Sequence, residues 1–177
     1  DVFGIHKLTK DIDCSDTVNW NGGKGFLLVV EFDHPFEGEL DGQGFTISNL
    51  NVVRSDQPGG LFGFATGATI KNLKFDGGVI DHTEATDIDM SAVDDPTGNI
   101  NKLPLAGSLV GLGSDLTIDN IQTNVPVYTN RVLGVSGGLV GALFPNNLFN
   151  LGDRSTYASS ITNIALNNDV EGYVAGG

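Results

Sequence analysis

Ile70-Lys71-Asn72-Leu73 decides the fold, because its pattern Ile-x-Asn-(Leu/Ile) occurs four times in 177 residues. The other copies are Ile47-Ser48-Asn49-Leu50, Ile118-Asp119-Asn120-Ile121 and Ile161-Thr162-Asn163-Ile164. Side chains alternate between the two faces of a β-strand, so the isoleucine is expected to point inward and the variable polar residue outward. The Asn–Leu step then leaves the strand at a bend. Four such copies indicate a repeated structural unit.

A second pattern alternates with the first and keeps phase with it. Its copies are Gly60-Leu61-Phe62-Gly63, Ser108-Leu109-Val110-Gly111 and Gly138-Leu139-Val140-Gly141. The first two copies begin ten residues before the next Ile-x-Asn pattern. The third keeps this spacing if residues 145–157 form an outward loop.

A unit of about 20 residues with short strands and glycine turns cannot bury its own inner face, so it must stack on its neighbours. We therefore predict an all-β chain wound as a right-handed parallel β-helix, or solenoid. Two loop insertions, near residues 81–104 and 145–157, are expected at one corner. The chain is predicted to be one continuous domain, in which residues 1–44 form an N-terminal cap and first coil and residues 45–177 form the stacked repeats.

The repeated polar and small residues have predicted structural roles. The four asparagines are expected to lie at an inward bend and to hydrogen-bond along the stack as a ladder; the alternative is four unrelated turn asparagines. The glycines are expected to serve a positive φ or a close approach between coils. The ladder residues are Asn49, Asn72, Asn120 and Asn163, and the structural glycines are Gly60, Gly63, Gly111, Gly138 and Gly141.

The N-terminal part of the chain differs from the repeats. Residues 8–13 and 26–32 are predicted to be strands, the second of them buried on both faces because it is continuously apolar. Terminal units of a solenoid are atypical because one face must be shielded.

Charge and composition exclude several classes of partner. Nine basic and 22 acidic residues give a net charge of −13, which disfavours nucleic acid and anionic lipid. No apolar run is long enough to span a membrane. Cys14 is the only cysteine, which excludes an internal disulfide and a cysteine-based metal site. The chain begins with Asp1 rather than Met and is interpreted as a processed or excised segment.

An acidic segment between residues 87 and 99 is a candidate calcium site, because it concentrates carboxylates in a predicted loop. It lacks the spacing of an EF-hand, and a solvated acidic loop is the alternative. No other cofactor is required. The candidate ligands are Asp87, Asp89, Asp94 and Asp95.

No catalytic constellation is recognisable, so the chain is not predicted to be an enzyme. His6, His34 and His82 lie in different segments without a metal-binding spacing, and no serine sits in a Gly-x-Ser-x-Gly elbow. Few lysines and arginines are present to hold an acidic sugar chain.

The chain resembles the GLUG-motif repeats of large bacterial surface proteins, which occur in adhesins and beside IgA-cleaving metallopeptidases. The resemblance rests on residues 8–13, on Trp20, on the run Phe36 to Leu50 and on Gly60-Leu61-Phe62-Gly63, and it covers nearly the whole chain outside the insertions. Ser108 departs from it by replacing a usual glycine. The resemblance implies a β-helical stalk, and it is weak evidence for any particular activity.

We therefore predict an extracellular structural or adhesive module. Its partners are expected to be a surface glycan or protein, or sibling subunits stacked head to tail. Leu148 and Phe149 are a candidate contact loop; the alternative is that they fold back over the coil. Other functions left open are a β-helix that binds or cleaves polysaccharide and an accessory region of a surface metallopeptidase.

Overall fold

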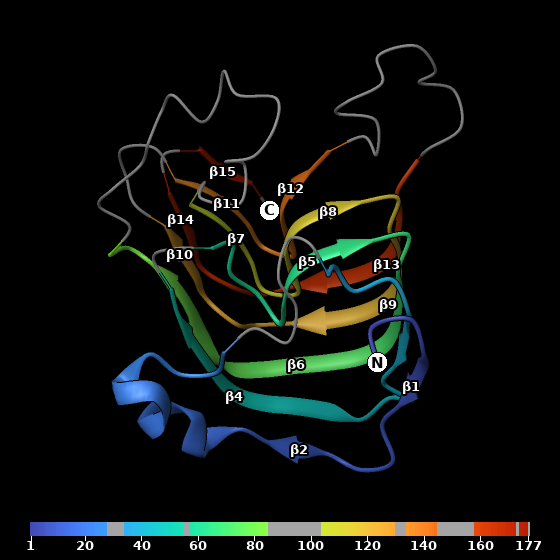
Figure 1. The fold of residues 1–177 in the computed structure, drawn as a ribbon, viewed down its shortest axis with the longest axis horizontal. Coiled ribbons are helices and arrows are strands. Elements are labelled where there is room, and N and C mark those ends of the chain that lie inside the picture. The colour runs from blue at the N-terminus through green and yellow to red at the C-terminus, as the bar shows by residue number, and fades with distance from the viewer. Residues whose placement is uncertain are drawn as a thin grey trace.

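The computed structural model of the chain describes residues 1–27, 34–54, 57–84, 104–129, 134–144, 158–172 and 174–176. These residues are mostly β and form parallel sheets, with one 3-10 helix, η1 (Ser15–Gly23), near the N-terminus (Figure 1). The largest sheet contains β1 (Ile5–Lys7), β2 (Ile12–Asp13), β3 (Glu39–Asp41), β4 (Thr46–Val53), β6 (Thr69–His82), β9 (Thr117–Thr123), β10 (Val127–Thr129), β13 (Ser160–Leu166) and β14 (Val170–Glu171). Two smaller sheets contain β7 (Leu105–Gly107), β11 (Val135–Gly137) and β15 (Val174–Gly176), and β5 (Phe62–Thr66), β8 (Val110–Ser114) and β12 (Val140–Leu143).

The strands β1 to β4 all belong to the largest sheet. From β5 onward the chain visits the three sheets in a fixed order, and each return to a sheet, here called a pass, adds a strand parallel to its neighbour (Figure 1). Glu39 pairs with Thr69, and Val110 pairs with Val140. In both pairs the partners lie thirty positions apart in the sequence. The predicted unit of about 20 residues is therefore wrong, because one pass also includes a third run of strand, such as β7 or β11, that neither sequence pattern marks.

Each Ile-x-Asn pattern turns a corner within its strand. The four asparagines have φ angles of 59°, 54°, 54° and 55° in chain order, which is the left-handed region that Asn tolerates better than most residues. A residue in this conformation interrupts the alternation of faces, so Ile70 and Leu73, three positions apart, are both buried. The same holds for Ile118 and Ile121.

The core consists of columns of apolar side chains, one from each pass of the chain. Val52, Ile80 and Val127 occupy one such column, and none of the three is exposed. At another position, the rings of Phe36 and Phe62 stack with centroids 4.3 Å apart. Burial of these columns is the main favourable contribution to folding.

The two insertions enter at different junctions rather than at one corner. Residues 85–103 follow β6 and precede β7, whereas residues 145–157 lie between β12 and β13. The sequence spacing showed where the repeat was interrupted but not which pair of sheets the interruption separates, so this part of the prediction was wrong.

Residues 1–44 contribute strands to the same sheet as the repeats, since β1 pairs with β3 and β2 with β4. The predicted strand over residues 8–13 is shortened to Ile12–Asp13. Residues 26 and 27 of the predicted strand 26–32 are not in a strand, and residues 28–32 lie outside the described residues. The sequence patterns also did not reveal η1. It is attached to β4 by Thr17, whose buried hydroxyl donates to the Cys14 carbonyl (2.6 Å) and accepts from the Asn51 amide (3.0 Å).

Candidate functional site

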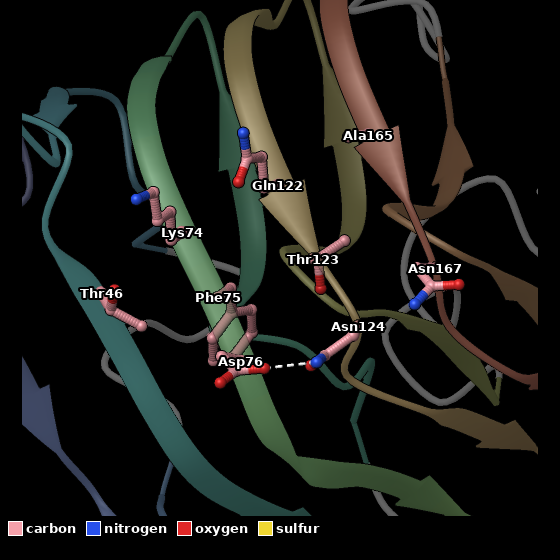
Figure 2. A pocket seen from close by; sticks show the side chains of 9 residues that line it. All are labelled: Thr46, Lys74, Phe75, Asp76, Gln122, Thr123, Asn124, Ala165 and Asn167. Atoms are coloured by element: carbon pink, nitrogen blue, oxygen red, sulfur yellow. Dashed lines mark hydrogen bonds between the residues drawn. The ribbon is translucent and has the colours of Figure 1, made fainter.

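A groove lined mainly by polar residue types, here called the polar groove, crosses the outer face of the largest sheet and has a volume of about 300 Å³ (Figure 2). Carbon atoms of these residues and of the backbone nevertheless supply most of its exposed surface. Strands β4, β6, β9 and β13 and the residues just after them supply its lining. The lining residues are Thr46, Lys74, Phe75, Asp76, Gln122, Thr123, Asn124, Ala165 and Asn167.

Strand register arranges these residues into two outward rows that run across the strands. The first row is Thr46, Lys74, Gln122 and Ala165, which are paired from strand to strand. The second row lies two residues further along each strand and contains Asp76, Asn124 and Asn167. Between the rows, Phe75 and Thr123 point into the protein and are buried, so the groove floor is largely backbone.

The second row contains a fixed amide. Asn124 donates from Nδ2 to Asp76 Oδ1, the contact drawn as a dashed line in Figure 2, and its Oδ1 accepts from the Gly77 amide at 2.7 Å. Hydrogen bonds at both ends hold this side chain in one orientation before any ligand arrives. The Asp76 and Asn124 side chains are nevertheless exposed.

Three of the four predicted ladder asparagines share one column at a corner of the sheet. Asn120 Nδ2 donates to Asn72 Oδ1 (2.9 Å), and Asn72 Nδ2 donates to Asp41 Oδ1 (3.0 Å). Register places Asn163 beside Asn120, but its amide donates to Asp119 instead (2.7 Å). These side chains lie on the outer face, so the expected inward orientation was wrong; the left-handed corner turns the asparagine away from the core.

Asn49 does not belong to this column. Ser48 pairs with Asp76 and Leu50 with Gly78, which places Asn49 beside Gly77 at a second corner of the sheet. Its Nδ2 donates to Asp13 Oδ1 at 3.2 Å. A four-membered ladder was therefore an error: β6 turns at both Asn72 and Gly77, and the same motif occupies different corners in β4 and β6.

The predicted structural glycines are brought into two columns. Phe62 and Val140 both pair with Val110, which aligns Gly60, Ser108 and Gly138 in one column and Gly63, Gly111 and Gly141 in the other. A Cβ on Gly111 would lie 2.8 Å from Gly59 N, and one on Gly141 would lie 2.7 Å from Ala106 N. Close approach of neighbouring backbones, rather than a positive φ, therefore requires glycine at these two positions. At Ser108 the buried hydroxyl donates to the Gly138 carbonyl (2.6 Å), which explains how serine is accommodated.

Hydrogen bonds lower the pKa of three carboxyl groups beside the corner asparagines, of which Asp13 is exposed and Asp41 and Asp119 are half-buried. A hydrogen bond from Thr162 has the largest effect on Asp119 and lowers its pKa, and one from Asn163 adds to this. For Asp41, the largest effect is the hydrogen bond from Asn72, and one from the Gln43 backbone amide adds to it. For Asp13, it is the hydrogen bond from the Ser15 amide, followed by that from Asn49. A depressed pKa means that the ionised group contributes stability above its ordinary value of 3.8 and that this contribution is lost as the pH falls through the folded-state pKa.

Replacing Thr162 with valine is expected to raise the pKa of Asp119 toward 3.8, because the hydroxyl donates to Asp119 Oδ1 at 2.7 Å. The variant should also lose less stability than the parent between about pH 5 and pH 2. NMR titration of the carboxyl carbon measures the pKa directly. Thr117→Val, on the strand that carries Asp119, is the matched control and should leave it unchanged. A Thr162→Val variant with an unaltered Asp119 pKa would contradict this interpretation.

The remaining predicted site residues lie outside the described residues. These are Asp87, Asp89, Asp94 and Asp95 of the candidate calcium site and Leu148 and Phe149 of the candidate contact loop. Among the described residues, no group of three or more His, Cys, Asp or Glu side chains is placed to hold a metal ion. The described part of the chain also contains no helix with the length and apolar character needed to cross a bilayer.

Sequence reasoning missed the groove, although a signal for it was present. Lys74, Gln122 and Ala165 each directly follow the last residue of an Ile-x-Asn pattern, so they occupy the same position in three repeats. Once the asparagine corner is known, this position must face outward. Its three occupants differ in type, which is why the pattern alone did not identify it.

Fold and groove together define a mostly β protein with parallel sheets and a polar outer face. Halomucin from Haloquadratum walsbyi is 34% identical to the chain over 117 residues, a match that covers 60% of this chain. The matched segment spans about 1% of the length of halomucin. No family model and no solved structure matches the chain.

Proposed function

We propose that the chain forms a right-handed β-helix like that implied for GLUG repeats and serves as an extracellular structural or adhesive module. The observation that carries this proposal is that all three sheets grow by parallel strands in register as the chain advances. Strands joined by crossovers in this way are almost always connected with a right-handed sense. Stacked coils make a stiff scaffold, and their junctions tolerate insertions on which binding surfaces are commonly built.

Two further features support an extracellular role. The similarity to halomucin relates the chain to a very large protein that is named as a mucin. The net charge of −13 favours solubility in salt, where self-repulsion is screened. Calcium bound by Asp87, Asp89, Asp94 and Asp95 remains part of the proposal, because carboxylate oxygens are ligands that Ca²⁺ prefers.

The partner proposed for the ends of the stack is a second copy of the chain. At one end, Ile161 and Leu166 on β13 are 39% and 37% exposed, and at the other end Ile12 on β2 is 38% exposed. The strand register pairs Ile12 with Ile47, and it continues through Phe75 and Thr123 to Leu166. Ile12 and Leu166 are therefore the two exposed ends of one column. A second copy stacked head to tail would continue this column and pair the edge of β13 that has no strand partner among the described residues.

Replacing Leu166 with lysine is expected to abolish concentration-dependent association of the chain, because it places a charge in the proposed contact between copies. Sedimentation velocity over a hundredfold range of concentration measures this. Thr117→Lys is the matched control, since Thr117 is exposed on the outer face of β9, a strand that is paired on both sides and therefore lies away from either end. A parent chain that stays monomeric at the highest concentration would remove the stacking proposal.

A further inference from the structure

We propose that the polar groove binds a short segment of an uncharged polysaccharide, laid across strands β4, β6, β9 and β13. This inference deepens the proposed adhesive role, because it names the ligand class and the residues that contact it. The groove exists whether or not copies of the chain stack, so the two proposals can fail separately.

Charge is the first argument for an uncharged ligand. The lining contains one cationic side chain, Lys74, and one anionic side chain, Asp76, so the groove is neutral within a chain whose net charge is −13. The field of the whole chain repels polyanions at low salt. A single ammonium group beside a carboxylate offers little compensation to an acidic sugar chain.

The polar groups of the lining are the second argument. Gln122, Asn124 and Asn167 present amides, each of which can donate and accept, and Thr46 adds a hydroxyl. Sugar hydroxyls also donate and accept, so they match this mixture better than a purely acidic or basic ligand would. The hydrogen bonds from Asn124 to Asp76 and from Gly77 to Asn124 hold one of these groups, the Asn124 amide, in place together with the Asp76 carboxylate, which reduces the entropy lost on binding.

Geometry gives the orientation of the ligand. Neighbouring strands lie about 4.8 Å apart, so the second row presents a polar side chain at that interval, and the first row does so up to Gln122 and ends on Ala165. Figure 2 shows Lys74 and Gln122 next to each other on adjacent strands, with Asn124 and Asn167 further along their segments. An extended chain of sugar rings lying parallel to the rows can therefore contact successive strands. The volume of about 300 Å³ is at the lower end for ligand sites, which restricts the contact to a few rings.

The test is NMR titration of the full chain with uncharged hexasaccharides, namely cellohexaose, mannohexaose and chitohexaose, and with hexagalacturonate as the anionic comparison. At least one uncharged probe is expected to shift the side-chain amide signals of Gln122, Asn124 and Asn167 at millimolar concentration. Gln122→Ala and Lys74→Ala should each weaken this binding by about fivefold or more, in line with the loss of one or two hydrogen bonds.

Matched controls separate binding from folding. Thr117→Ala lies on the same strand as Gln122 but outside the groove. Lys24→Ala removes the same charge as Lys74→Ala at an exposed position beside Val53, at the other end of β4 from Thr46. Both controls should bind as the parent does. Lys74 and Gln122 are exposed, so their variants should keep the circular dichroism spectrum of the parent.

Two results would overturn the inference. One is the absence of signal changes at the groove with every uncharged probe, and the other is tighter binding of hexagalacturonate than of all the uncharged probes. Either result would leave the stacking proposal standing, because sedimentation tests that proposal without any ligand.

Discussion

Gly78→Ala is expected to lower the free energy of unfolding by about 2–5 kcal/mol, from a left-handed backbone and from overpacking. Gly78 has a φ of +80° at the corner of β6 beside Leu50. A Cβ there would overlap the Leu50 carbonyl oxygen and lie 2.5 Å from Leu50 N. These are backbone atoms of a neighbouring strand, so the strain cannot be relieved by rotating a side chain.

Gly44→Ala is the matched control for Gly78→Ala. Gly44 has nearly the same φ, +81°, but nothing lies within 4 Å of the position its Cβ would take. Its replacement is expected to lower the free energy of unfolding by only about 1–2 kcal/mol, which is the cost of a left-handed backbone for a residue with a Cβ. Urea denaturation compares the two variants; if Gly78→Ala cannot be purified folded, denaturation of the parent and of both variants in the same stabilising osmolyte gives the comparison. Equal losses at both positions would show that the β4 and β6 backbones are not as close as the structure has them.

Ile118→Ala is expected to lower the free energy of unfolding by about 2–5 kcal/mol, because it leaves a cavity in a closely packed column. Ile118 is fully buried on β9, between Ile70 on β6 and Ile161 on β13. Thermal or urea unfolding measures the loss.

Ile161→Ala makes the same chemical change in the same column. It is expected to lower the free energy of unfolding by less than about 1 kcal/mol in dilute solution. Ile161 lies on the outermost strand of that column and is 39% exposed, so part of its surface is already in water. A loss at Ile161 equal to that at Ile118 would show that this end is covered in solution.

The repeated patterns predicted much of the β architecture. Ile-x-Asn copies marked β4, β6, β9 and β13, and the Gly-Leu-Phe-Gly pattern marked the junctions before β5, β8 and β12. The prediction of parallel sheets came from the same patterns, because equivalent strands of successive repeats lie side by side and run in the same direction. Strand length was less predictable: β6 continues to His82 through two corners, and the sequence showed only the first of them.

The candidate site was not predicted, for a reason visible in its residues. Lys74, Gln122 and Asn167 come from three passes of the chain and share no residue type. Each by itself is an ordinary exposed polar residue. Only register brings them together, and register depends on the length of every junction between them.

From the sequence it could already be read that the isoleucines of the Ile-x-Asn pattern face inward, that equivalent residues recur, and that the chain is strongly acidic. These properties are local, because they depend on side-chain chemistry and on the alternation of a strand. The tertiary structure decided that one pass takes about thirty residues, that Asn49 lies at a different corner from Asn72, and that two polar rows enclose a groove. These properties depend on which strands pair, and a shift of one residue in pairing would reverse the face of every side chain.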